Sequence, residues 1–67
     1  MIWPQFADAL QTLSSAHREI LLQTYFKGRT VQQAAAALGL PLGTAKSRLY
    51  YATRALKVVL EEWGVTG

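Results

Sequence analysis

A chain of 67 residues with a net charge of +3 is large enough for one small domain. The absence of cysteine excludes disulfides and a thiol nucleophile, and a single histidine argues against a zinc site built by this chain alone. Hydrophobic residues make up 51% of the chain, yet no apolar run approaches the roughly 20 residues of a membrane span. Because the N-terminus also lacks the pattern of a signal peptide, the predicted location is the cytoplasm.

The first predicted helix runs from Pro4 or Gln5 to Leu13. Proline suits the first turn of a helix, where its missing N–H costs nothing. Phe6, Leu10 and Leu13 recur at helical spacing, so we expect them to face the core.

The second predicted helix begins after Ser14, its expected N-cap, and runs to about Phe26, with Gly28 as the stop signal. The lone histidine, His17, is expected on its surface rather than in a ligand site. The apolar face of this helix is predicted from Ile20, Leu21, Thr24 and Tyr25.

The third predicted helix opens at Thr30, which forms a capping-box pattern with Gln33. The four alanines of residues 34–37 make this helix thin, so a neighbouring backbone can approach closely. Leu38 is expected to anchor it, and Gly39 stands where a left-handed residue commonly ends a helix.

The fourth predicted helix follows a turn at residues 40–42, begins near Gly43 or Thr44 and extends to about Trp63. Gly64 is the expected stop, and residues 65–67 are expected to form a loose tail. An apolar stripe steps along the helix by threes and fours through Leu42, Ala45, Leu49, Ala52, Leu56 and Val59. The sequence thus predicts an all-α fold, a small four-helix domain with a helix-turn-helix over about residues 30–57.

Positive charge is concentrated in the middle of the chain. Six of the seven Lys and Arg lie between Lys27 and Lys57, and no Asp or Glu occurs from Lys27 to Leu60. A helix-turn-helix with an acid-free basic surface is most simply a reader of duplex DNA. The alternative is a solvated basic face with no partner, although solvated faces usually mix both signs of charge.

The predicted contacts fall into two groups. Helix N-termini enter the major groove in such folds, and the candidates for base reading are Thr44, Lys46, Ser47, Tyr50 and Tyr51. The candidates for phosphate contact are Lys27, Arg29, Arg48, Arg54 and Lys57. No nucleophile–base pair, metal-ligand set or phosphate-cradling glycine loop is evident in the sequence, so we expect neither enzyme activity nor a cofactor.

Three blocks of the sequence resemble region four of bacterial sigma factors, and the extracytoplasmic-function group above all. They read L-S-S-A-H-R-E-I-L at residues 13–21, Y-F-K-G-R-T at 25–30 and A-A-A-L-G-L-P-L-G-T-A-K-S-R-L at 35–49. The last block is the most specific. Ser15 stands where the family usually has proline, Ala45 replaces its usual valine, and Tyr51 and Thr53 occupy positions where arginine is common.

The resemblance implies a domain that reads the −35 promoter element and docks on the flap of the RNA polymerase β subunit through its first helices. The base-reading positions of the family map onto Lys46, Ser47, Tyr50 and Tyr51. Anti-sigma factors are common partners of such domains. A sigma factor also needs a domain for the −10 region, so we expect this chain to be a fragment of a larger factor.

Two other interpretations remain open at this stage. The output domain of a LuxR/GerE-type response regulator shares the early L-S-x-x-x-x-E-x-L rhythm, although the G-T-A-K-S-R-L block favours a sigma factor. A protein-docking module without DNA binding would instead use the apolar first half of the chain, together with Trp3 and Trp63. Salt-dependent DNA binding separates this last class from the other two.

Overall fold

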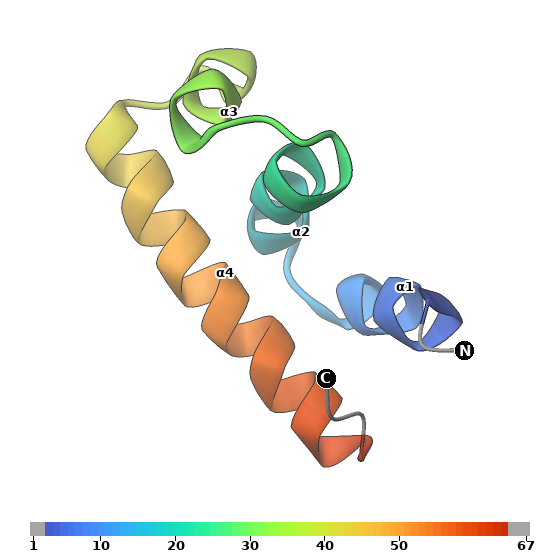
Figure 1. The fold of residues 1–67 in the computed structure, drawn as a ribbon. Helices are drawn as coiled ribbons and strands as arrows, with labels where there is room; N and C mark the ends of the chain where they lie inside the picture. The colour runs from blue at the N-terminus through green and yellow to red at the C-terminus, as the bar shows by residue number, and fades with distance from the viewer. Residues whose placement is uncertain (1–2, 65–67) are drawn as a thin grey trace.

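The computed structural model describes the backbone of residues 3–64 and the side chains of residues 5–64, so the predictions for the Trp3 side chain and for the tail lie outside the described residues. Its elements are α1 (Trp3–Thr12), α2 (Ser15–Leu21), the π-helical turn η1 (Leu22–Phe26), α3 (Val31–Leu38) and α4 (Leu42–Glu62). The long helix α4 contacts each of the three shorter α-helices, which lie along it in the order α3, α2, α1 (Figure 1). The predicted all-α fold is confirmed.

Local signals define the helix starts as the sequence predicts. The Ser14 hydroxyl accepts a hydrogen bond from the His17 N–H at 3.3 Å. At α3 both halves of the capping box form: Gln33 N–H donates to the Thr30 hydroxyl at 3.1 Å, and Thr30 N–H donates to Gln33 Oε1 at 2.9 Å. These bonds satisfy backbone donors that the first turn of a helix leaves unpaired.

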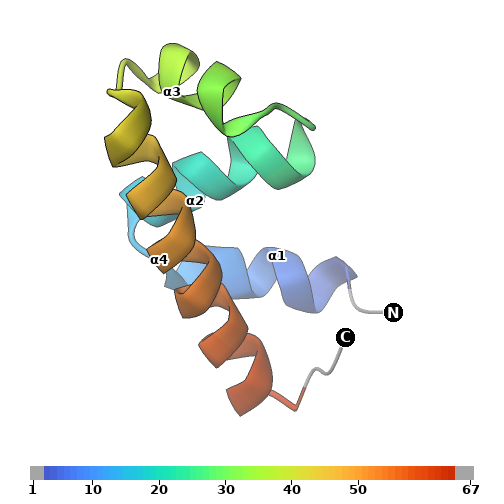
Figure 2. The same cartoon turned by 60° about the vertical axis from the view of Figure 1, so that its left-hand side comes forward.

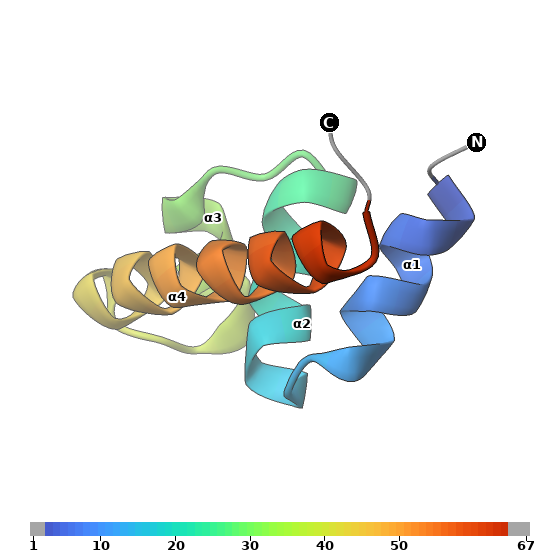
Figure 3. The same ribbon diagram turned by 90° about the horizontal axis from the view of Figure 1, so that it is seen from below.

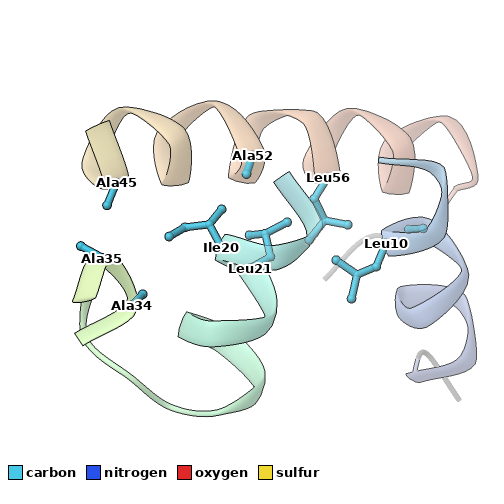
Figure 4. Packing of buried hydrophobic residues seen from close by; sticks show 9 residues of the cluster. Leu10, Ile20, Leu21, Ala34, Ala35, Ala45, Ala52 and Leu56 are labelled. Carbon is cyan, nitrogen blue, oxygen red and sulfur yellow. The ribbon is translucent and has the colours of Figure 1, made fainter. Parts of the chain in front are cut away.

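Small side chains dominate the buried core. Among residues 5–64, five of the nine buried residues are alanines, namely Ala9, Ala34, Ala35, Ala45 and Ala52. Figure 4 shows Ala35 of α3 and Ala45 of α4 pointing toward one another, while Ile20 and Leu21 of α2 fill the space below Ala52. An alanine on each side lets two helix backbones approach more closely than larger residues allow, so this pair is placed as the sequence predicts for the thin third helix.

The second helix departs from the prediction because its last turn is π-helical. Lys27 N–H donates to the Leu22 carbonyl five residues earlier, at 3.0 Å. A π turn takes more residues than an α turn, so the helical spacing used to assign the apolar face no longer applies. The prediction for Tyr25 is wrong: its side chain is 59% exposed, and Phe26 packs toward the core instead, with its ring 5.6 Å from that of Phe6.

Helix ends differ from the predicted ones by a residue or two, as is usual for terminal turns. The largest consequence is at α4, which begins at Leu42 rather than at Gly43 or Thr44. Leu42 is 39% exposed and does not belong to the buried stripe predicted for it, because it precedes the point where α4 meets α3 at Ala45. Among the helices described, none is both long and apolar enough to cross a membrane.

The neighbouring leucines of α2 and η1 provide a test of this packing. We expect Leu21→Ala to lower the free energy of unfolding by about 2–5 kcal/mol, because Leu21 is fully buried between α2 and α4. Leu22→Ala removes the same atoms from a side chain that is 37% exposed, so we expect a loss within about 1 kcal/mol. Urea unfolding followed by circular dichroism measures both. Equal losses would show that the register of this helix is wrong.

Candidate nucleic-acid interface

The turn between α3 and α4 fixes the angle at which α4 leaves the core. Gly39 adopts the left-handed conformation at φ 68°, which a side chain disfavours. Its N–H donates to the Ala36 carbonyl at 3.3 Å, and the Leu40 N–H donates to the Ala35 carbonyl at 2.8 Å. These two bonds form a Schellman motif, which terminates α3 and redirects the chain into Pro41. The geometry of a helix-turn-helix is therefore built into local hydrogen bonds.

The start of α4 carries no side-chain cap. Its N-cap residue, Pro41, offers no hydrogen-bonding side chain, and the Ala45 N–H is the one that donates back to the Pro41 carbonyl, at 3.0 Å. The N–H groups of Leu42, Gly43 and Thr44 precede this first bond and belong to exposed residues. Such a helix N-terminus favours an anion, because its amides and the helix dipole both point toward one.

The five predicted base readers all lie on the exposed part of α4: Thr44, Lys46, Ser47, Tyr50 and Tyr51. Figure 3, in which α4 lies in front of α2 and α3, shows that one side of the helix is not covered by another helix. At about 100° per residue, the five side chains are spread over an arc of about 160° around the axis of α4, with Lys46 at one edge and Thr44 at the other. This arc is wider than one groove floor, so the residues at its edges face the groove walls.

The predicted phosphate contacts are not all on one surface. Lys27 and Arg29 are exposed in the segment between η1 and α3, and Arg54 and Lys57 are exposed on α4. Arg48 is half-buried and points from the side of α4 opposite to Lys46, so the structure separates it from the other cations.

Arg29 is held in place by its neighbours in η1. Its Nη1 donates to Gln23 Oε1 at 2.5 Å, and its backbone N–H donates to the Gln23 carbonyl at 3.1 Å. Both bonds tie the basic segment to Gln23 in the first half of η1. A cation whose rotamers are already restricted loses less entropy when it binds a phosphate.

A groove of about 380 Å³ separates this segment from α4. One wall carries Tyr25 and Val31, which flank the basic segment, and the other wall carries Lys46, Tyr50 and Arg54. Figure 2 shows how α3 lies beside the first turns of α4, which carry the second wall of the groove. Two cations of α4, Lys46 and Arg54, therefore border a concave surface whose other wall lies on either side of the basic segment in sequence.

An aromatic cluster on α4 joins three of the predicted contact residues. The rings of Tyr50 and Tyr51 meet edge to face with centroids 5.2 Å apart. The Arg54 guanidinium carbon lies 5.6 Å from the centroid of the Tyr50 ring, and Arg54 Nη1 donates to the Tyr50 hydroxyl at 3.2 Å. Lys46 and Ser47 lie one turn earlier, so the cluster continues the same exposed surface.

Sequence reasoning missed the place of Tyr25 in this surface. Its spacing from Ile20 and Leu21 fits the inward face of an α-helix, so the sequence predicts a core position. The π turn that moves Tyr25 outward has no signal in the sequence. A hint was available in its neighbour Phe26, which is the more apolar of two adjacent aromatic residues and the one that packs inward. With Tyr25 in the groove wall, the surface includes η1 as well as α3 and α4.

Acidic residues lie away from this surface. Asp8 is exposed on α1, Glu19 on α2, and Glu61 and Glu62 are exposed in the last turn of α4. Within residues 5–64, no group of three or more His, Cys, Asp or Glu is arranged to hold a metal ion. Among the described residues, the acids thus lie outside the segment from Lys27 to Leu60 that carries the basic surface.

Comparison with known proteins identifies this arrangement. The family model described as Sigma-70, region 4, matches residues 9–58. The chain is 50% identical over 60 residues to the ECF RNA polymerase sigma factor SigL of Mycobacterium tuberculosis, in the strains Erdman, CDC 1551 and H37Rv. That match covers 90% of this chain but 34% of the relative, so the chain spans about a third of the length of the curated relatives it matches.

The family match includes α2, η1, the complete helix-turn-helix and most of α4, and with them all ten predicted DNA-contact residues. It favours the sigma-factor interpretation over the response-regulator alternative, in agreement with the G-T-A-K-S-R-L block at the start of α4. The chain belongs to the sigma-70 region 4 family, the promoter-recognition domains that act in transcription initiation.

Proposed function

We propose that this chain reads the −35 element of a promoter by placing the first turns of α4 in the major groove of DNA. The observation that carries the proposal is the coincidence of two features on one helix. All five predicted base readers are exposed on α4, and no acidic residue occurs from Lys27 to Leu60. A helix that presents polar and cationic side chains, without repelling carboxylates, suits the edges of base pairs between two phosphate strands.

Base reading falls to the residues nearest the start of α4. Lys46 offers an ammonium for guanine O6 and N7, while Ser47 and Thr44 offer hydroxyls that either donate or accept. Tyr51 replaces an arginine that is common in the family and presents an aromatic surface suited to the methyl group of thymine. This difference is the one we expect to change base preference relative to related domains.

Phosphate binding comes from two sides. Lys27 and Arg29 hold one strand from the segment before α3, and Arg54 and Lys57 hold a strand from further along α4. The uncapped N-terminus of α4 supports a third contact through its backbone amides. These contacts set the position of the helix, and the base readers then supply the sequence preference.

The remaining surface is proposed to serve protein partners. The first helices, which carry Asp8 and Glu19, would dock on the β flap of RNA polymerase in the cytoplasm, and an anti-sigma factor would cover either this surface or the DNA-binding one. In this role the chain acts through binding alone, as one part of a larger sigma factor. A second candidate function is a docking module without DNA binding. It is favoured by the exposed hydrophobic side chains of Trp63 and Val58.

The test of the proposal is selection of bound duplexes from a random promoter-sized library at low and moderate salt, followed by sequencing. Enrichment of one short motif, together with affinity that falls steeply with salt, is the expected result. Binding at neither salt would refute the proposal and favour the docking module. Salt-sensitive binding without a motif would remove the base-reading role from this chain.

Lys46→Ala should reduce the preference for the selected motif, costing about 1–3 kcal/mol on that motif and less on a scrambled duplex, because a base contact is lost. The matched control is Lys57→Ala, which removes the same charge from an exposed position about three turns further along α4. We expect it to weaken both duplexes equally. Fluorescence anisotropy with both duplexes measures the four affinities. If Lys46→Ala also weakens both equally, Lys46 is a phosphate contact.

Arg54→Ala should lower affinity for all duplexes and flatten the plot of log affinity against log salt by about one unit, since one phosphate contact is lost. Arg18→Ala is the control, because Arg18 lies on α2 and outside the proposed interface. It should leave the slope unchanged. A slope that is unaffected by Arg54→Ala would contradict the assignment of Arg54 to phosphate.

A further inference from the structure

The contact between Tyr50 and Arg54 is unusually complete for two exposed side chains. They lie one turn apart on α4, where side chains at this spacing are neighbours. The guanidinium sits over the ring at 5.6 Å, within the range of a cation–π contact, and also donates a hydrogen bond to the phenol oxygen at 3.2 Å. Two different interactions therefore restrict one long side chain that would otherwise sample many rotamers.

We propose that Tyr50 and Arg54 form a single composite clamp for one DNA phosphate, in which Tyr50 is the positioning residue and also donates its own hydroxyl proton. This inference rests on the proposed DNA-binding function and goes beyond it. It moves Tyr50 from the predicted base readers to the phosphate contacts. It also makes the contribution of Arg54 depend on a second residue.

The hydrogen-bonding capacity of the pair fits one phosphate group. A guanidinium has five N–H donors, and Tyr50 engages one nitrogen of Arg54, which leaves donors on the others. The Tyr50 hydroxyl uses a lone pair to accept from Arg54, so its proton remains available to donate. A phosphate of the DNA backbone has two non-bridging oxygens that accept hydrogen bonds. The pair offers two donors for them, the charged guanidinium of Arg54 and the neutral hydroxyl of Tyr50.

The position of the pair along α4 also points to the DNA backbone rather than to the bases. At 1.5 Å per residue, Tyr50 lies about 12 Å and Arg54 about 18 Å from the start of the helix at Leu42. The major groove is roughly 8.5 Å deep, so on a helix that enters by its N-terminus both residues lie above the floor of the groove, nearer to its phosphate edges. Both residues also border the groove that faces the basic segment before α3.

Tyr51 supports the pair from the other side. Its ring meets that of Tyr50 edge to face at an interplanar angle of 84°, an arrangement that aromatic rings prefer. This contact restricts the ring of Tyr50 while leaving Tyr51 itself 61% exposed. Tyr51 therefore helps to hold Tyr50 in the position where Arg54 contacts it.

The test is a double-mutant cycle with Tyr50→Phe and Arg54→Ala, measured on the selected motif and on a scrambled duplex across a range of salt. Tyr50→Phe keeps the ring and removes only the hydroxyl. We expect it to weaken binding to both duplexes by about fivefold, the loss of a typical hydrogen bond. In the Arg54→Ala background the same change should cost less than about twofold, because the two residues act as one unit.

Tyr51→Phe is the matched control, since it deletes a hydroxyl from the adjacent tyrosine without touching the bond to Arg54. Its effect should add fully to that of Arg54→Ala. Additive effects of Tyr50→Phe and Arg54→Ala would overturn the composite clamp while leaving the DNA-binding function intact. So would a Tyr50→Phe effect confined to the selected motif. If the unsubstituted chain bound neither duplex, the proposed function itself would fail, and the clamp with it.

Discussion

The close packing of α3 against α4 sets the direction of α4 and, with it, the position of the proposed DNA-binding surface. Ala35 of α3 and Ala45 of α4, both buried, point toward one another across this contact (Figure 4). Larger side chains at these positions would force the helices apart and change the angle at which α4 leaves the core. This contact sets the direction in which the exposed surface of α4 faces. The Schellman motif at Gly39 constrains the same angle between α3 and α4 through local backbone hydrogen bonds.

The distribution of charge along the chain makes the exposed surface of α4 suitable for binding a polyanion. A small domain with a net charge of +3 is only mildly basic, but six of its seven cations lie between Lys27 and Lys57, and no acid occurs from Lys27 to Leu60. The field near α4 is therefore more positive than the net charge suggests, which favours association with a polyanion. The same separation leaves the first helices less positive and available to a protein partner. One small domain thus presents two surfaces of different chemistry.

Much of this arrangement follows from local rules and was predictable from the sequence. Ser14, Thr30 and Gly39 mark helix ends through hydrogen bonds between residues close in sequence, so the sequence alone identifies them. The exposed positions of Lys46, Ser47 and Tyr51 follow from helical periodicity in the same way. These features depend on neighbours within a turn or two.

The features that were not predictable depend on contacts between distant residues. The π turn of η1 lets Phe26 reach Phe6 on α1, and this packing decides which of two adjacent aromatic residues is buried. Leu42 is exposed because α3 contacts α4 three residues later, which helical spacing does not reveal. The Tyr50–Arg54 contact requires particular rotamers as well as the right spacing, and the groove beside it requires three elements together.

If the exposed side of α4 and the basic segment before α3 form the DNA-binding surface, their backbone amides should respond when DNA is added. The decisive measurement follows the backbone amide NMR signals of this chain as a duplex containing the selected motif is added. We expect the largest shifts at residues 42–54 and 27–30, with little change in α1. Shifts concentrated in α1 and α2, with α4 unaffected, would contradict it.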